Sequence, residues 1–209
     1  MINGIILELI SGLWTIFIFW GINKFIRKHD TECLLPSMSN FYYAISFYMG
    51  FLCGRFERFS IITMILMDIS IAYILYMMFT DITTYQLYSS LNIAGFVIGM
   101  IYLAMQGDIV AYGKGIWLYF LIVIISCITH TISVGDMELM ISLSPYLYLY
   151  SVDMSYSIMF AFLLFYALTL LVTIAINIKK YIKTKQNNIP FAVSIAISYM
   201  LLIISFGIN

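Results

Sequence analysis

Two aspartates stand beside long apolar stretches and could act chemically as a pair. Asp81 follows the apolar stretch 59–79, and Asp136 follows the stretch 115–134. Like charges a few ångströms apart cannot both ionise cheaply, so one carboxyl group of such a pair keeps its proton while the other loses it. The ionised group can activate water as a base, and the protonated group can polarise a carbonyl and protonate the leaving amine. This division of roles hydrolyses a peptide bond without a metal or a nucleophilic side chain.

Two neighbours of Asp136 could support this chemistry. Gly135 has no Cβ and lets a backbone or a substrate approach closely. Glu138 follows by two residues, which on a helix places it on a different face from Asp136. We interpret Glu138 as a first-turn glutamate favoured by the helix dipole, with a supporting acid as the alternative. The pair also has a structural alternative, because aspartate is a favoured N-cap and both residues could cap the helices that follow.

A third acid and a cysteine–histidine pair are separate candidates. Asp68 lies 13 residues before Asp81, which is about 20 Å along a continuous helix, so the two acids cannot share one site. We interpret Asp68 as hydrogen-bonded inside the bundle, with a proton or ion relay as the alternative. Cys127 and His130 are three residues apart on one predicted helix face and could form a thiol–imidazole nucleophile. A buried structural role is favoured for this pair, since a free cysteine usually behaves as a small core residue.

The composition places these residues in a membrane protein. Of the 209 residues, 63% are hydrophobic and 10% are charged, against roughly 45–50% and about 25% in soluble domains. The mean hydropathy is +1.01. A soluble enzyme, a nucleic-acid-binding protein and a disordered chain are therefore excluded. Ten basic and ten acidic residues give a net charge of zero, so no polyanionic partner is indicated.

The hydropathy pattern predicts an all-α polytopic membrane helix bundle, formed as a single domain over residues 1–209. A bilayer-crossing helix needs about 20 apolar residues. We expect about eight transmembrane spans, at 5–25, 40–54, 59–79, 89–106, 115–134, 138–152, 156–178 and 189–208. The second and sixth are short. No basic region precedes the first span and no small-residue cleavage site follows it, so we expect it to be retained rather than removed as a signal peptide.

The basic residues orient these spans. With the N-terminus outside, the inner loops hold Lys24, Arg27, Lys28, Lys179, Lys180, Lys183 and Lys185, and the outer loops hold Arg55, Arg58 and Lys114. This asymmetry follows the positive-inside rule and predicts that both termini lie outside. Spans 59–79 and 115–134 then run in the same direction. Asp81 and Asp136 are therefore expected at the same, cytoplasmic, membrane surface.

Three segments, taken in order, resemble the type IV prepilin peptidases, which are membrane aspartyl proteases of the GxGD type. They are Asp81-Ile82-Thr83-Thr84-Tyr85-Gln86-Leu87, Val134-Gly135-Asp136-Met137-Glu138-Leu139 and Ile189-Pro190-Phe191-Ala192. The chain departs from the family pattern at Ser133, which replaces the first glycine of the motif, at Glu138, which replaces a lysine, and at Ala192, which replaces a glycine.

A cysteine-rich zinc loop, which larger family members carry, is not expected in this chain. Its three cysteines, Cys33, Cys53 and Cys127, are too widely spaced for a CxxC pair, and only Cys33 falls in the corresponding loop. We therefore expect no metal and no cofactor.

The resemblance implies that Asp81 and Asp136 are the catalytic pair of an aspartic endopeptidase. Such an enzyme cuts leader peptides from prepilin-like precursors at the cytoplasmic face of a prokaryotic cell membrane, in type IV pilus assembly or protein secretion. Its partners would be those precursors and the lipid bilayer, with no nucleic acid, and its oligomeric state is open. A small-molecule transporter or substrate-binding subunit using Asp68 is the main alternative. A thiol membrane protease using Cys127 and His130 and a presenilin-like protease are further alternatives.

Overall fold

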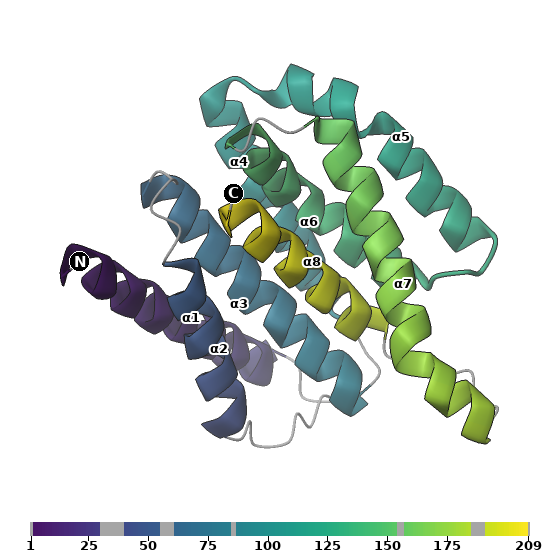
Figure 1. The fold of residues 1–209 in the computed structure, drawn as a ribbon, viewed down its shortest axis with the longest axis horizontal. Coiled ribbons are helices and arrows are strands. Elements are labelled where there is room, and N and C mark those ends of the chain that lie inside the picture. Colours follow the sequence, from purple (N-terminus) through teal and green to yellow (C-terminus); the bar gives the residue numbers. More distant parts are fainter. Residues whose placement is uncertain are drawn as a thin grey trace. The chain divides into compact units, whose positions relative to one another are not determined.

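The predicted all-α architecture is confirmed by a computed structural model of the chain (Figure 1). It describes residues 2–29, 40–54, 61–84, 87–153, 157–184 and 191–208. Within these residues there are eight helices and no strand. The helices are α1 (Ile2–His29), α2 (Asn40–Cys53), α3 (Ile61–Thr84), α4 (Ser89–Gln106), α5 (Ile109–Ile128), α6 (Val134–Asp153), α7 (Ile158–Thr184) and α8 (Phe191–Ile208). Some residues used in the sequence predictions lie outside the described ranges: Cys33, Arg55, Arg58, Lys185 and Pro190.

Five of the described helices, α1, α3, α4, α5 and α7, are long and apolar enough to cross a membrane. The three others correspond to the predicted spans 40–54, 138–152 and 189–208. Helix α2 has only 14 residues, and the apolar part of α8 is short. Helix α6 has 20 residues but carries several serines and tyrosines and a proline in its interior. The direction in which the helices cross the membrane stays a prediction.

The chain divides between Gln86 and Leu87 into two compact units. The first contains α1, α2 and α3, and the second contains α4 to α7 with most of α8. The expectation of one domain over residues 1–209 stays a prediction. Asp68 and Asp81 belong to the first unit, and Asp136 belongs to the second.

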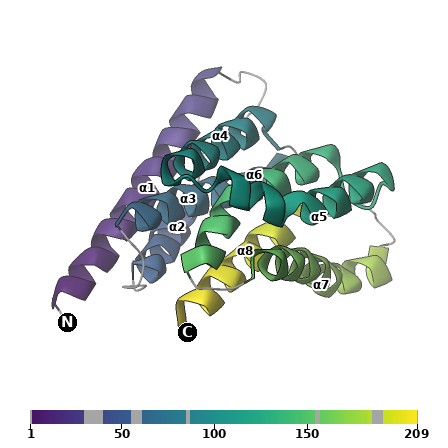
Figure 2. The same cartoon turned by 90° about the horizontal axis from the view of Figure 1, so that it is seen from above.

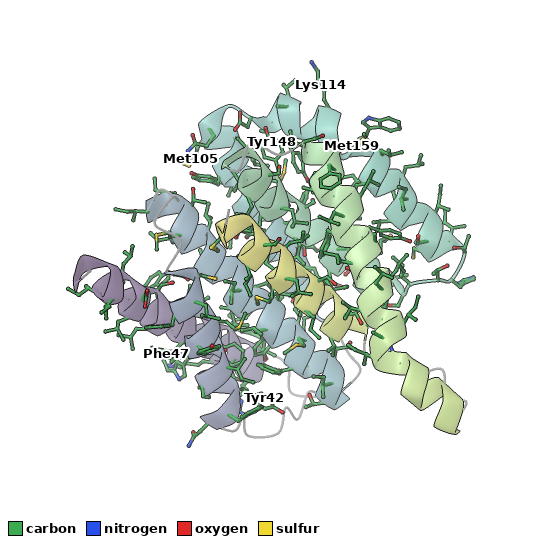
Figure 3. The ribbon with its side chains drawn as sticks, in the orientation of Figure 1. Tyr42, Phe47, Met105, Lys114, Tyr148 and Met159 are labelled. Carbon is green, nitrogen blue, oxygen red and sulfur yellow. The ribbon has the colours of Figure 1, made fainter. Side chains whose placement is uncertain are left out.

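Glycines allow α1 and α2 to pack closely in the first unit (Figure 1). A Cβ added to Gly54, directly after α2, would lie 2.5 Å from the Cα of Glu8 in α1. A Cβ on Gly12 would lie 2.8 Å from the ring of Phe47, which is labelled in Figure 3. Small residues let two helix backbones approach in this way, and dispersion contacts then hold the helices together within a bilayer.

Aromatic rings join α3 to the other helices of the first unit. Phe19 of α1 is fully buried, and its ring meets those of Tyr43, Tyr76 and Phe79 at centroid distances of 5.5, 5.6 and 5.9 Å. All three contacts are edge-to-face, the arrangement that the ring quadrupole favours. This cluster contains side chains from α1, α2 and α3 and fixes the C-terminal half of α3. Asp81 lies in this half, and the helix ends at Thr84.

Helix α6 is the central helix of the second unit and packs against α4, α5 and α7 (Figure 2). Several of its polar side chains are buried, and Tyr146 and Ser144 form hydrogen bonds with neighbouring helices. The Tyr146 hydroxyl donates to the carbonyl of Gly95 in α4 at 2.8 Å, and the Tyr112 hydroxyl of α5 lies 2.7 Å from that of Ser144. Because its neighbours cover these groups, α6 can be more polar than a helix that faces lipid.

Two predicted helix boundaries are wrong, and both affect the candidate pair. We expected Asp81 after its helix, but α3 continues to Thr84 and holds Asp81 in its last turn. The hydroxyls of Thr83 and Thr84 donate to helix carbonyls, so the helix continues beyond the end of its apolar stretch. The predicted span 115–134 is instead α5, which ends at Ile128, and Asp136 lies in the first turn of α6 rather than in a loop.

The close contact of α1 with α2 can be tested by Gly54→Ala. The added methyl group would overlap backbone atoms of α1, which cannot rotate away, so the free energy of unfolding should fall by about 1–3 kcal/mol. The matched control is Gly21→Ala in α1, because a Cβ there meets nothing within 4 Å. Chemical unfolding in detergent would measure both variants. Equal stability of the two variants would contradict the close packing.

Candidate functional site

The connection between α5 and α6 has a defined backbone structure. The amide of His130 donates to the carbonyl of Cys127 at 3.0 Å, and that of Thr131 donates to the carbonyl of Ser126 at 2.9 Å. These two bonds form a Schellman motif that ends α5. His130 occupies its left-handed position with a φ of 58°, where glycine is usual. A side chain in this conformation costs roughly 1–2 kcal/mol.

Ser133 and Asp136 begin α6 through reciprocal hydrogen bonds. The backbone amide of Asp136 donates to Oγ of Ser133 at 3.2 Å. In return, the amide and hydroxyl of Ser133 donate to Oδ2 of Asp136 at 3.2 and 2.6 Å. This is a capping box with aspartate in the place of the usual glutamate. The structural alternative for Asp136, a part in helix capping, is therefore observed, with Ser133 as the N-cap.

The carboxyl group of Asp136 is buried and is held by one of its two oxygens. Only 7% of the residue is exposed, and this burial raises the pKa of Asp136, while the hydrogen bonds from Ser133 lower that pKa in part. The N-terminus of α6 also favours the ionised form through the helix dipole. Among the described residues, hydrogen bonds reach Oδ2 but not Oδ1. The cap therefore orients the carboxyl group and leaves Oδ1 available to water or a substrate.

Asp136 lines a cavity of about 450 Å³ inside the second unit. Its polar lining comes from His130, Thr131, Ser133, Asp136 and Thr173, and its apolar lining from Ile132, Leu170, Ile174 and Phe191. A volume of this size, with mixed polar and apolar walls, is typical of sites that bind small ligands or parts of larger ones.

Residues from all three segments that resemble the prepilin peptidases lie close to Asp136 in the second unit. A Cβ added to Gly135 would lie 3.4 Å from Cβ and Cδ1 of Leu87, the last residue of the first segment. Phe191, from the third segment, begins α8 and lines the Asp136 cavity. The space beside Gly135, which we expected a substrate to approach, is thus bordered by the side chain of Leu87.

Glu138 lies apart from the Asp136 cavity. Its carboxylate accepts a long hydrogen bond of 3.4 Å from the amide of Asn92 in α4, and both residues line a second cavity of about 190 Å³. The expected placement on a different face from Asp136 is confirmed. The interpretation as a first-turn glutamate is wrong, because α6 begins at Val134 and Asp136 is the acid of its first turn.

Asp81 is buried near the C-terminal end of its helix, whereas Asp136 is buried near the N-terminal end of its own. It is 7% exposed and lies in the last turn of α3, at the negative end of the helix dipole. It does not stand at the start of a helix, so it is no N-cap. Asp81 and Asp136 belong to different units, and the proximity of their carboxyl groups stays a prediction.

Asp68 has the hydrogen-bonded environment that we favoured for it. It is 3% exposed, and its Oδ1 accepts hydrogen bonds from the hydroxyls of Ser11 at 2.6 Å and Thr15 at 3.2 Å, both in α1. It also lines a mostly apolar cavity of about 260 Å³ in the first unit. The relay alternative for Asp68 stays a prediction.

The proposed thiol–imidazole geometry is wrong. Cys127 lies in α5, whereas His130 lies beyond the end of that helix in the left-handed turn, so the two do not share a helix face. In the described part of the chain, no hydrogen bond joins their side chains, and no three His, Cys, Asp or Glu residues form a group that could hold a metal ion.

Two features of this site were missed in the sequence. Ser133-x-x-Asp136 matches the capping-box pattern, and this signal would have placed the start of α6 correctly. The left-handed conformation of His130 has no such signal, because glycine or asparagine is the usual residue there.

Comparisons with protein families, with characterised proteins and with solved structures gave no match to this chain. The resemblance to the prepilin peptidases therefore rests on the three short segments, and it stays a prediction.

The burial of Asp136 predicts a pH dependence of stability. Its pKa is raised in the folded protein above the value of about 3.9 for an unfolded chain, so the folded state binds more protons between the two values. This contribution to stability is present below the unfolded pKa and is lost as the pH rises through the folded one. Unfolding of the wild type and Asp136→Asn, from pH of about 4 to neutrality, should show the loss in the wild type alone. A stability difference that does not change with pH would contradict this account.

Proposed function

We propose that this protein is an intramembrane aspartic endopeptidase in which Asp81 and Asp136 form the catalytic pair. Its substrates would be prepilin-like precursors, and it would cut their leader peptides at the cytoplasmic face of the cell membrane. One observation carries this proposal: Leu87, Gly135, Asp136 and Phe191, from the three resembling segments, gather at one place in the second unit.

The length of the chain supports the pairing of the two aspartates. Asp81 is six residues before Leu87, and an extended chain covers at most about 3.6 Å per residue, so these two residues can be no more than about 22 Å apart. Leu87 itself contacts the position beside Asp136. The covalent link therefore limits how far Asp81 can lie from Leu87, and this limit supports a pairing of Asp81 with Asp136.

The two helix ends divide the roles between the aspartates. Burial raises the pKa of Asp136 and so strengthens it as a base, while the two donors from Ser133 on Oδ2 and the positive end of α6 favour its ionised form, so we assign it the role of base. Asp81, in the last turn of α3, is suited to be the protonated acid. Neither role requires a positively charged side chain beside the carboxyl group.

The reaction then balances without a metal. Asp136 takes a proton from water, whose oxygen bonds to the peptide carbonyl carbon while Asp81 donates a hydrogen bond to the carbonyl oxygen. The C–N bond breaks as Asp81 transfers its proton to the leaving amine. A proton passes from Asp136 back to Asp81 and resets the pair.

A solute transporter that uses Asp68 is the second candidate function. The observation that favours it is the cavity of about 260 Å³ beside Asp68. The hydrogen bonds from Ser11 and Thr15 to that carboxyl group favour a structural role for Asp68 over a role in transport. The two functions predict opposite effects of the same substitutions.

The catalytic pair can be tested with Asp81→Asn and Asp136→Asn. Asparagine keeps the size and hydrogen bonding of aspartate but transfers no proton, so each variant should cut a co-expressed prepilin-like precursor at least about 100-fold more slowly. The double variant should be hardly worse than either single one, because paired catalytic groups act as a unit. The size shift of the precursor on a gel measures cleavage.

Asp68→Asn and Cys127→Ser are the matched controls for this assay. Both should insert and cleave at nearly the wild-type rate, with Asp68→Asn losing stability because it weakens the bonds to α1. Cleavage by Asp136→Asn at the wild-type rate would disprove the assignment. A phenotype confined to Asp68→Asn, together with lost uptake of a solute, would favour the transporter.

Removal of metal ions provides an independent test of the two-aspartate reaction. Because carboxyl groups alone activate the water, cleavage should continue at an unchanged rate after dialysis against strong chelators. Precursor processing by purified, chelator-treated protein is the measurement. Loss of cleavage that added Zn²⁺ restores would contradict the proposed mechanism.

A further inference from the structure

We propose that the cavity lined by His130 and Asp136 is a peptide-binding subsite, in which the imidazole of His130 hydrogen-bonds the backbone of an extended, uncharged peptide segment. This inference rests on the proposed function, and it names the part of the substrate that the cavity accepts. The first observation behind it is the left-handed backbone conformation of His130.

The position of His130 disfavours its own side chain. With a φ of 58°, glycine would fit the turn without strain, and both Schellman bonds use backbone atoms alone. The imidazole is exposed and lines the cavity. A strained residue whose side chain does nothing for its turn points to another use of that side chain, and in the described part of the chain this side chain lines the cavity.

The polar lining suits a peptide backbone. The hydroxyl groups of Thr131 and Thr173 already have partners, Thr129 at 3.0 Å and the carbonyl of Thr169 at 2.7 Å. Their oxygens still have lone pairs that can accept from peptide N–H groups. A neutral imidazole adds one donor and one acceptor. The alternating N–H and C=O groups of an extended chain match this set.

The charge of the lining argues against an anionic ligand. Among the residues that the structure describes, no lysine or arginine lines the cavity, and the carboxyl group of Asp136 would repel a phosphate or carboxylate. Of these described lining residues, His130 alone could be a cation for an anionic lipid headgroup. An uncharged peptide segment meets no such penalty.

The apolar lining sets the side chain that the subsite accepts. Leu170 and Ile174 come from α7, and Phe191 comes from the start of α8. Together they suit an aliphatic or aromatic side chain next to the peptide bond that the water activated by Asp136 attacks. The volume of about 450 Å³ leaves room for that side chain together with its backbone.

The test uses two variants of His130, one variant of Thr173 and a fluorescent peptide with a basic leader followed by an apolar segment. Binding of this peptide to the full-length protein in detergent is measured by fluorescence anisotropy. His130→Gly should bind about five- to tenfold more weakly, the loss expected for one hydrogen bond. Its thermal midpoint should equal or exceed that of the wild type, because glycine relaxes the turn. His130→Asn should bind within about twofold of wild type, since asparagine tolerates this conformation and keeps a donor and an acceptor.

The third variant, Thr173→Trp, acts by filling the cavity. It should abolish detectable peptide binding. Leu171→Trp is the matched control, because Leu171 is 62% exposed on the same helix and does not line the cavity, and it should bind like the wild type. Wild-type binding by Thr173→Trp would overturn the subsite.

The outcomes separate this inference from the proposed function. Undiminished binding and cleavage by His130→Gly, or equal losses in His130→Gly and His130→Asn, would overturn the subsite and leave the peptidase standing. Peptide binding that depends on His130 in a wild type that never cleaves would support the subsite and disprove the peptidase. Displacement of the peptide by anionic phosphatidylglycerol vesicles, but not by phosphatidylcholine vesicles, would overturn the subsite in favour of a lipid headgroup site.

Discussion

The reciprocal hydrogen bonds between Ser133 and Asp136 fix where α6 begins, and the arrangement of the second unit depends on that point. Helix α6 is the one that α4, α5 and α7 all contact. A start one residue earlier or later would rotate its polar groups by about 100° around the helix axis. Tyr146 would then miss the carbonyl of Gly95, and Ser144 would miss Tyr112. The cap thus sets the register of buried hydrogen bonds along the whole helix.

The same hydrogen bonds set a limit on the chemistry of Asp136. Here Oδ2 is engaged by Ser133. In the proposed reaction, a carboxyl group fixed in this way loses little conformational entropy when it meets a substrate, because the helix cap already orients it. Ser133 stands where the resembling family has a glycine, so this chain orients its aspartate through a side chain that such a motif lacks.

The number and order of the helices could be predicted from the sequence, because apolar stretches long enough to cross a bilayer leave few alternatives to a helix. The helix ends could not be predicted from hydropathy. Thr83 and Thr84 are polar, yet their hydroxyls bond to the backbone and extend α3 past Asp81. His130 ends α5 through a conformation that its residue type disfavours. For the site, the residue Asp136 was found but its cavity was not, since Thr173 and Phe191 come from helices distant in the sequence. The approach of Asp81 to Asp136 depends on how two units pack, which local pattern does not encode.

The polar interior of α6 has a consequence for how the protein enters the membrane. A segment with several serines, tyrosines and a proline partitions poorly into lipid when it leaves the ribosome alone. Two of its side chains, Tyr146 and Ser144, pair with Gly95 of α4 and Tyr112 of α5, and both of these helices precede α6 in the chain. Helices α4 and α5 are therefore synthesised before α6 and can offer these partners as α6 enters the lipid. Insertion of α6 then depends on its neighbours as well as on its own hydropathy.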